Sequence, residues 1–192
     1  LVGIITACLW GNAQAAEISA FINSVKLPKN NALENNQNQN LVRLSESEIA
    51  LVYFLDQGSK SQIYFTLSRN NGKNFTQPIL ISEGQLGASL PNMVVAQDGN
   101  NGKQIFIFWV DAGQIYYRSS RDMGVTFGST LKISGKYLNA RYVSLALDAD
   151  QRIHLVFEDS GQIYYRYLSG RQSDAWSEIF ILSEKGKSSS LP

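Results

Sequence analysis

The chain has 192 residues, of which 44% are hydrophobic and 17% are charged, a composition typical of a globular protein and not of a disordered one. Seventeen basic and sixteen acidic residues give a net charge of +1, so we expect neither nucleic acid nor an anionic membrane surface as a partner. One cysteine and one histidine argue against a disulfide framework and against a zinc or iron–sulfur site, and we expect no metal and no cofactor.

Residues 1–16 have the features of a secretory signal that lacks its basic start. The apolar run at its beginning holds about ten residues, too few to cross a bilayer at about 20 residues per crossing. Ala13 and Ala15 offer the small side chains that a signal peptidase reads. We therefore expect an exported protein, periplasmic or secreted, with no transmembrane span in the mature chain. The alternatives are a lipid anchor on Cys8, which ends a lipobox-like sequence, and a buried first strand or helix.

Residues 17–40 are expected to lead into the fold. Apolar side chains alternate from Ile18 to Ile22, which predicts a short strand. Eight of the eleven residues from 30 to 40 are Asn or Gln. Such a tract buries too little apolar surface to offset the entropy of ordering, so we predict a linker or surface loop.

A repeat of about fifty residues organises the rest of the chain. The sequence Gly-Gln-Ile-Tyr-Tyr-Arg at 113–118 recurs unchanged at 161–166, with a variant at 61–66. Each copy follows an apolar run that closes on Asp and precedes a short run that ends in Ser, and a further apolar run begins each unit. The expected strands are 41–44, 51–56, 61–66 and 79–82 in unit one, 93–97, 105–111, 113–118 and 131–134 in unit two, and 142–147, 153–159, 161–166 and 179–183 in unit three.

The repeat predicts the fold class. Near-continuous apolar runs such as 105–110 indicate strands that are covered on both faces. Four such strands in every fifty residues are typical of the blade of a β-propeller. We predict an all-β fold, a β-propeller of four-stranded antiparallel blades at about 41–88, 89–138 and 139–190. A β-sandwich is the main alternative, but it would leave the repeat unexplained.

One segment of unit two resembles a known family motif. Residues 120–127, Ser-Arg-Asp-Met-Gly-Val-Thr-Phe, match the Asp-box, Ser-x-Asp-x-Gly-x-Thr-Phe/Trp, of sialidase-like (neuraminidase) β-propellers, also called the bacterial neuraminidase repeat. Unit one carries a copy at 68–75 with Asn at the Asp and Thr positions. Unit three carries a copy at 169–176 that lacks the Asp and the Gly. The structural box residues are Ser120, Asp122, Gly124, Thr126 and Phe127, with Ser68, Asn70, Gly72, Phe75 and Trp176.

The chemistry expected of the box is structural. Its glycines can adopt a positive φ where the hairpin turns, and its Ser and Asp side chains can bond to backbone groups of the turn. Its aromatic side chains are expected to pack between neighbouring blades. The resemblance implies that these boxes lie on the face away from the active site, so Asp122 is not expected to act as a catalytic acid.

The resemblance also implies what a sialidase would need, namely three arginines for the substrate carboxylate, a Tyr–Glu pair and an acid/base Asp. The first arginine belongs to an Arg-Ile-Pro motif that enters an inner strand, where this chain has Ser89-Leu90-Pro91. Arg141 of unit three is interpreted as two positions out of register with that motif, so no residue is assigned as catalytic. We expect a non-catalytic module that binds a protein or glycan, or a component of an envelope complex. The alternative is an exo-sialidase whose catalytic residues lie largely beyond residue 192.

Ligand contacts are expected in the longer connections between units, where the best candidates are Arg141 and Tyr137. Asp111 and Asp159 belong to Asp-x-Gly turns and are more typical of turn residues than of acids at a pocket mouth. Structural roles are expected for His154, as a packed core histidine, and for Arg118 and Arg166. The strand residues Tyr116, Tyr117, Tyr164 and Tyr165 are expected in the core, because they recur in a buried strand.

The sequence predicts that the three units are not the whole ring. Residues 189–192, Ser-Ser-Leu-Pro, repeat the sequence pattern of 88–91 and are expected to begin a fourth blade. By the resemblance, the ring would hold six blades. We expect the remaining blades to come from the rest of a longer chain or, alternatively, from a second copy.

Overall fold

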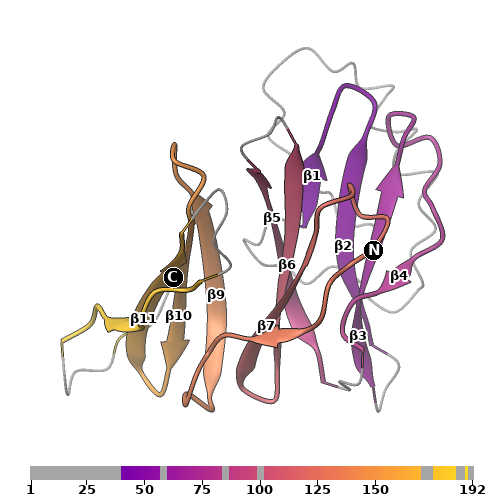
Figure 1. Cartoon of the computed structure of the whole chain (residues 1–192). Helices are drawn as coiled ribbons and strands as arrows, with labels where there is room; N and C mark the ends of the chain where they lie inside the picture. The colour runs from indigo at the N-terminus through magenta and orange to yellow at the C-terminus, as the bar shows by residue number, and fades with distance from the viewer. Residues whose placement is uncertain are drawn as a thin grey trace.

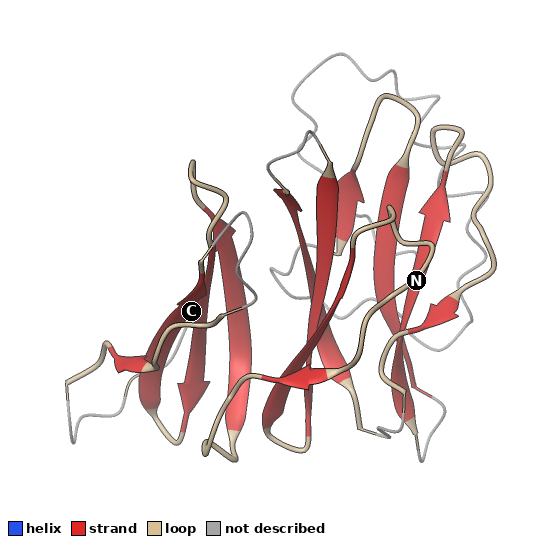
Figure 2. Ribbon diagram, in the orientation of Figure 1, coloured by secondary structure: helices blue, strands red, loops and turns tan. Residues whose placement is uncertain are grey.

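The computed structural model describes residues 40–56, 60–83, 87–98, 102–169, 175–184 and 189. Its regular structure is entirely β-strand, arranged in three antiparallel sheets of four strands each (Figures 1 and 2). Each sheet is a simple meander in which consecutive strands pair. The predicted signal at 1–16 and all but the last residue of the predicted lead-in lie outside the described residues.

The strands follow the predicted units closely, and we call the three sheets blades 1, 2 and 3. Blade 1 holds β1 (Leu41–Arg43), β2 (Ile49–Asp56), β3 (Ser61–Ser68) and β4 (Ile79–Leu80). Blade 2 holds β5 (Ser89–Gln97), β6 (Lys103–Asp111), β7 (Gln114–Ser120) and β8 (Leu131–Lys132). Blade 3 holds β9 (Ala140–Leu147), β10 (Ile153–Asp159), β11 (Gln162–Leu168) and β12 (Phe180–Ile181).

The fourth strand of each blade is shorter than predicted, because a serine side chain takes over its pairing. Ser82 Oγ accepts a hydrogen bond from Ile63 N at 2.9 Å, and Ser134 Oγ accepts one from Ile115 N at 3.2 Å. In blade 3 the hydroxyl of Ser183 does the same at 3.0 Å. The serine that closes each predicted strand therefore replaces a ladder bond with a side-chain bond.

Apolar side chains fill the spaces between the blades. Blades 1 and 2 enclose a cluster that includes Val52, Phe65 and Trp109, all of them fully buried. Blades 2 and 3 enclose a second cluster, with Phe108 and Phe157 at its centre. The central sheet is therefore covered on both faces, as its continuous apolar strands predict. This stacking of four-stranded blades is that of a β-propeller, and the blades leave the ring open (Figure 1).

The meander places the turns at two ends of each blade. One end, the box face, carries the first and third turns of each blade, where Asn71 N bonds to Ser47 O at 2.9 Å. The other end, the front face, carries the middle turns and the connections between blades. There Ala88 N bonds to Ser61 O at 2.9 Å, and Ala140 N bonds to Gly113 O at 2.9 Å. A candidate ligand at the front face would therefore meet the blade connections and not the box turns.

Candidate functional site

The inner strands of blades 2 and 3 begin with the same irregularity. In blade 2, Ser89 pairs with Val110, and the register then shifts so that Asn92 pairs with Phe108. In blade 3, Arg141 pairs with Glu158 and Ser144 with Val156, again across a shift. A β-bulge of this kind inserts residues without a partner and re-aims the side chains beside it.

This bulge corrects the register predicted for Arg141. The residue after it, Tyr142, has a φ of 53°, and the residue after Ser89, Leu90, also has a φ of 53°. Arg141-Tyr142-Val143 is therefore the structural equivalent of Ser89-Leu90-Pro91. Arg141 is not two positions out of register. It lies seven positions after Ser134, as Ser89 lies seven positions after Ser82, and the two blades differ only in the turn after the inner strand, which is four residues shorter in blade 3. The structure therefore places Arg141 at the position equivalent to Ser89, which the sequence analysis matched to the arginine of the Arg-Ile-Pro motif.

Arg141 forms an ion pair with a buried carboxylate at the front face. Its Nε lies 3.2 Å from Glu158 Oε2, and the exposed fractions of the two side chains are 55% and 4%. Glu158 Oε1 accepts a second bond from Gly161 N at 2.9 Å. The equivalent residues of blades 1 and 2 are Phe54 and Val110, so blade 3 alone of the three places a charged pair at this position. An anchored, half-exposed guanidinium is able to bind an anion.

Tyr142 lies beside this arginine, and the sequence analysis did not identify it. The guanidinium carbon of Arg141 is 5.8 Å from the Tyr142 ring centroid, and the ring is 53% exposed. A left-handed backbone is uncommon for tyrosine, and such strained positions are typical of functional sites. Only the bulge places the ring there, and the sequence pattern carries no clear signal of the bulge.

Tyr137, the second predicted ligand contact, is half-buried and packs against the core between blades 2 and 3. Its ring centroid lies 4.2 Å from that of Tyr164 and 5.9 Å from that of Phe157. Its carbonyl accepts a bond from Gln114 Nε2 at 2.6 Å. Burial raises the pKa of Tyr164, and the neighbouring Tyr137 and Asp159 raise it further. Because its ring serves this packing, Tyr137 is not included in the candidate ligand site.

Asp111 and Asp159 hold the blade connections in place. Asp111 Oδ1 accepts a bond from Gly87 N at 3.1 Å, and Asp159 Oδ2 accepts one from Asn139 N at 2.8 Å. Each carboxylate thus caps the backbone just before the inner strand of its own blade. This is a turn role, in keeping with their Asp-x-Gly sequences.

The repeated strand tyrosines do not all lie in the core. Tyr117 and Tyr164 are 3% and 8% exposed, and Tyr116 is half-buried, stacked on Trp109 with ring centroids 6.0 Å apart. Tyr165, expected in the core, lies half-exposed on the outer side of blade 3. His154 is not a packed core histidine either, because its side chain is 29% exposed and bonds to Asp148 and Tyr165.

The box turns, residues 68–75 and 120–127, have the same pattern of hydrogen bonds. Ser120 Oγ accepts from Gly124 N at 2.8 Å, and Ser68 Oγ accepts from Gly72 N at 2.8 Å. The two glycines have φ values of 82° and 80°. In blade 2 this brings Gly124 against the neighbouring blade, where an added Cβ would lie 2.5 Å from Phe65 Cε1.

The acidic residue of the box bonds to the far side of the same turn. Asp122 Oδ1 accepts from Ser120 Oγ at 2.7 Å and from Thr126 N at 2.9 Å, and Oδ2 accepts from the Thr126 hydroxyl. These bonds, that from the Thr126 hydroxyl foremost, lower the pKa of Asp122 from 3.8 to about 2. In blade 1, Asn70 Oδ1 accepts from Asn74 N at 2.9 Å. A carboxylate held ionised by its own turn is a structural group and is unsuited to donate a proton.

Side chains of the box, and an arginine of the strand before it, join blades 2 and 3 to the preceding blade. Phe127 packs edge-on against Phe65 with ring centroids 5.1 Å apart, and Trp176 packs against Tyr117 at 5.7 Å. Arg118, whose side chain is 11% exposed, donates to the carbonyl of Ile81 in blade 1 at 3.2 Å. Two further residues complete the pattern, with Arg166 donating to the carbonyl of Ile133 in blade 2 and Phe75 packing on the outer side of blade 1.

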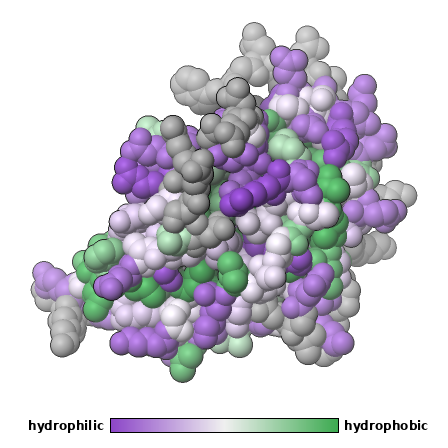
Figure 3. Space-filling model, in the orientation of Figure 1, coloured by the Kyte–Doolittle hydropathy of each residue, from purple (hydrophilic) through white to green (hydrophobic). Residues whose placement is uncertain are grey.

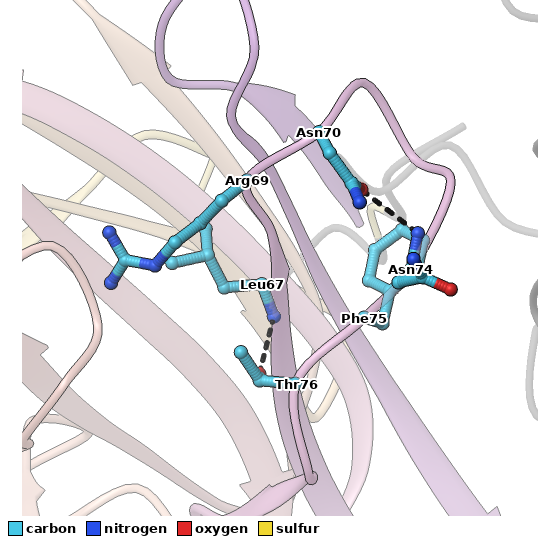
Figure 4. Close-up of a pocket in the computed structure, with 6 residues that line it drawn as sticks. All are labelled: Leu67, Arg69, Asn70, Asn74, Phe75 and Thr76. Carbon is cyan, nitrogen blue, oxygen red and sulfur yellow. Dashed lines mark hydrogen bonds between the residues drawn. The ribbon is translucent and has the colours of Figure 1, made fainter.

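A depression of about 230 Å³ lies on the box face, beside the box turn of blade 1 (Figure 4). Its polar groups bond within the turn, with Leu67 N donating to Thr76 Oγ1 at 3.1 Å and Asn74 N donating to Asn70 Oδ1 (Figure 4). Because these groups serve the turn, the depression is a product of the hairpin, and the front face remains the better candidate site.

Two negative findings apply to the described residues. They contain no group of three or more His, Cys, Asp or Glu side chains arranged to hold a metal ion. They also contain no helix long and apolar enough to cross a membrane.

Comparison with solved structures identifies similar folds. The catalytic domain of a Coprinopsis cinerea GH62 alpha-L-arabinofuranosidase superposes on 81% of this chain and 55% of its own, with a TM-score of 0.54 and 10% identity. The NanB sialidase from Streptococcus pneumoniae covers 67% of this chain and 20% of its own, with a TM-score of 0.49 and 21% identity. This chain therefore spans about half of the first protein and a fifth of the second. At 10% identity the likeness to the arabinofuranosidase domain supports the propeller fold and nothing finer.

Comparison of the sequence gives no further relative. No protein-family model matches the chain. No curated protein matches it either.

Proposed function

We propose that this chain is part of an exported, sialidase-like Asp-box propeller that acts as a non-catalytic binding module for an anionic glycan or protein ligand. The observation that carries the proposal is Arg141, which stands at the start of an inner strand, paired with the buried Glu158 and 55% exposed. A guanidinium fixed on one side and open on the other favours a planar carboxylate as its ligand.

Two features support the glycan as the ligand class. Tyr142 presents a half-exposed ring next to Arg141, and aromatic rings beside a charged group offer both an apolar surface and a polar edge. The position of Arg141 also matches that of the Arg-Ile-Pro arginine, although Tyr142 and Val143 replace Ile and Pro. The box turns support the assignment to sialidase-like Asp-box propellers. The predicted signal sequence supports the export of the protein.

The second candidate is an exo-sialidase, and the corrected register of Arg141 is the observation that favours it. Against it, the matched position in blade 2 holds Ser89, and the described front face supplies no second such arginine. Glu158, the glutamate beside Arg141, is engaged by that arginine and by the amide of Gly161, not by Tyr142. Glycoside hydrolysis needs a nucleophile and an acid/base group on opposite sides of the scissile bond. We therefore place binding ahead of hydrolysis.

The test is a binding titration of a sialylated trisaccharide with the protein expressed from its intact gene. Arg141→Ala is expected to weaken binding at least tenfold, and Arg141→Lys to weaken it less. Arg152→Ala is the matched control, because that arginine is 44% exposed and pairs with Asp148 at the box face. Equal affinity for Arg141→Ala and Arg152→Ala would refute the site.

A turnover assay separates the two candidates. The binding proposal expects no release of fluorophore from a fluorogenic sialoside. Turnover that is lost in Arg141→Ala and retained in Arg152→Ala would replace it with the sialidase.

A further inference from the structure

One tripeptide in the box turn of blade 1 has the sequence of a glycan acceptor. Residues 74–76 are Asn-Phe-Thr, which matches Asn-x-Ser/Thr, the acceptor sequence for N-linked glycans when x is not proline. Of the fifteen asparagines in the sequence, Asn74 alone has Ser or Thr two positions later. Such an acceptor is used in surface loops of exported proteins, so its exposure and the contacts of its side chains are the properties to compare.

The box turn places this tripeptide at the surface. Asn74 and Thr76 are exposed, and Phe75 between them is half-buried. The turn lies at the upper right of the molecule in Figure 1, and hydrophilic side chains gather at that part of the surface in Figure 3. The residue of blade 2 equivalent to Asn74 is Thr126, and it is exposed although blade 1 packs beside its box turn. A blade on the preceding side therefore leaves this position accessible.

The turn does not use the side chain of Asn74. In blade 2 the hydroxyl of Thr126 donates to Asp122, whereas the side-chain amide of Asn74 forms no hydrogen bond with the described residues. Its backbone nitrogen alone takes part, donating to Asn70 Oδ1 at 2.9 Å (Figure 4). Blade 3 has Ala175 at this position, which has no polar side chain. A sugar on the amide nitrogen of Asn74 would therefore break no hydrogen bond of the described fold.

The hydroxyl of Thr76, by contrast, belongs to the folded hairpin. Thr76 Oγ1 accepts a bond from Leu67 N at 3.1 Å, as Ser177 Oγ accepts one from Tyr167 N at 3.0 Å in blade 3. Blade 2 has Gly128 at this position and closes the same turn without a hydroxyl. Because folding engages the hydroxyl, an enzyme that reads it must act on the chain before the hairpin forms.

We propose that Asn74 carries an N-linked glycan, and this proposal rests on the export that the proposed function includes. Nδ2 of Asn74 attacks the anomeric carbon of a saccharide attached to a polyprenyl diphosphate, in a step catalysed by a transferase of the exporting cell. A bond forms between Nδ2 and that carbon, and the bond from the carbon to the diphosphate oxygen breaks. The amide loses one proton, and the polyprenyl diphosphate leaves.

The glycan would stand away from the proposed ligand site. Asn74 belongs to the box face, whereas Arg141 lies at the front face, at the opposite end of the blades. Loss of the glycan is therefore expected to leave ligand binding at Arg141 unchanged. The two proposals can fail separately for this reason.

The experiment is a mass measurement on the protein isolated from its natural source. Cleavage after Glu48 and Glu83 releases residues 49–83, which place Asn70, Asn71 and Asn74 in one peptide. Electron-transfer fragmentation keeps sugars attached and shows which side chain carries the additional mass. We expect one or more hexose or N-acetylhexosamine units on Asn74, and none on the other two asparagines, which are the internal controls. An unmodified peptide, or a sugar on another side chain, would overturn the proposal.

Two substitutions test the acceptor sequence in the same cells. Thr76→Ala should lower the fraction of glycosylated Asn74 at least tenfold, and Thr76→Ser, which keeps the hydroxyl that accepts from Leu67 N, should restore most of it. Equal glycosylation of Thr76→Ala and the wild type would contradict the proposal.

Cell fractionation and the ligand titration separate this proposal from the proposed function. Unmodified protein found outside the cytoplasm overturns the glycan alone, whereas protein retained in the cytoplasm overturns both the glycan and the export. Asn74→Gln should bind the sialylated trisaccharide as the wild type does and should unfold at the same urea concentration. A loss of stability in Asn74→Gln when neither protein carries a sugar would show that the amide serves the fold and would overturn the proposal.

Discussion

Replacing Asp122 with alanine tests whether the box turn stabilises the fold. The carboxylate accepts bonds from Ser120 Oγ, from Thr126 N and from the Thr126 hydroxyl. Alanine removes all three acceptor contacts. We expect the free energy of unfolding at pH 7 to fall by about 1–2 kcal/mol.

The pKa of Asp122 gives the magnitude. Lowering that pKa from 3.8 to about 2 corresponds to about 2.4 kcal/mol, at about 1.36 kcal/mol for each pKa unit. The carboxylate is exposed to solvent, however, and screening reduces such a contribution to about half or less. About 1 kcal/mol of charge stabilisation remains, and the lost bond to the Thr126 amide brings the total into the stated range.

The effect has a defined pH dependence. The folded pKa of Asp122 lies below the unfolded value, so its contribution is fully present above pH 4 or so and is lost as the pH falls toward about 2. Urea unfolding of the wild type and of Asp122→Asn at pH 7 and at pH 2.5 measures this. The stability difference between the two proteins should shrink at the lower pH.

Asp150→Ala is the control, because that side chain is 70% exposed and pairs with Arg152 in an ordinary turn. It should change the free energy of unfolding by less than about 0.5 kcal/mol. The reasoning is refuted if Asp122→Ala unfolds at the same urea concentration as Asp150→Ala, or if the Asp122→Asn difference is the same at both pH values.

Three further substitutions test other contacts of the fold and the site. Gly124→Ala should cost more than about 2 kcal/mol in urea unfolding, because its Cβ would meet a buried ring of blade 1, whereas Gly128→Ala, with 3.7 Å to its nearest neighbour, should cost under about 1 kcal/mol. Arg118→Met should cost about 1–3 kcal/mol by removing the donor to the carbonyls of Ile81 in blade 1 and of Phe127 in its own box turn, and Arg118→Lys should recover little of it. The double substitution Glu158→Val and Arg141→Ser introduces the residues that blade 2 has at the equivalent positions. This variant should unfold at the same or a higher urea concentration than the wild type, and its ligand binding should be lost. A large loss of stability would contradict this.

The blades could be predicted from the sequence because each strand carries its own signal. Gly113 and Gly161 mark the middle turns, with φ values of 72° and 79°, and the apolar runs beside them are long enough to be buried on both faces. Such features depend on a few neighbouring residues. They recur at nearly constant spacing, so a strand that is hard to assign in one unit can be assigned by comparison with the other two.

The site could not be predicted as well, because it depends on a register that the sequence does not fix. Counting back from the Tyr pair displaces Arg141, since the turn between the first two strands is four residues shorter in blade 3 than in blade 2. Side-chain direction raises the same difficulty. Tyr164 and Tyr165 are neighbours in an apolar strand, but one packs on blade 2 and the other faces away from it. A buried strand has two sides, and which side is covered depends on the neighbouring blades.

One departure from the repeat distinguishes blade 3 from blades 1 and 2. Phe54 and Val110 occupy the position of Glu158 in the other blades, so an apolar side chain is sufficient for the fold there. A buried carboxylate is costly even when paired, and its partner Arg141 remains 55% exposed to water. The pair therefore adds little to stability that valine or phenylalanine would not provide. What it does provide is a guanidinium fixed at the front face, and this is the property that the proposed binding of an anionic ligand requires.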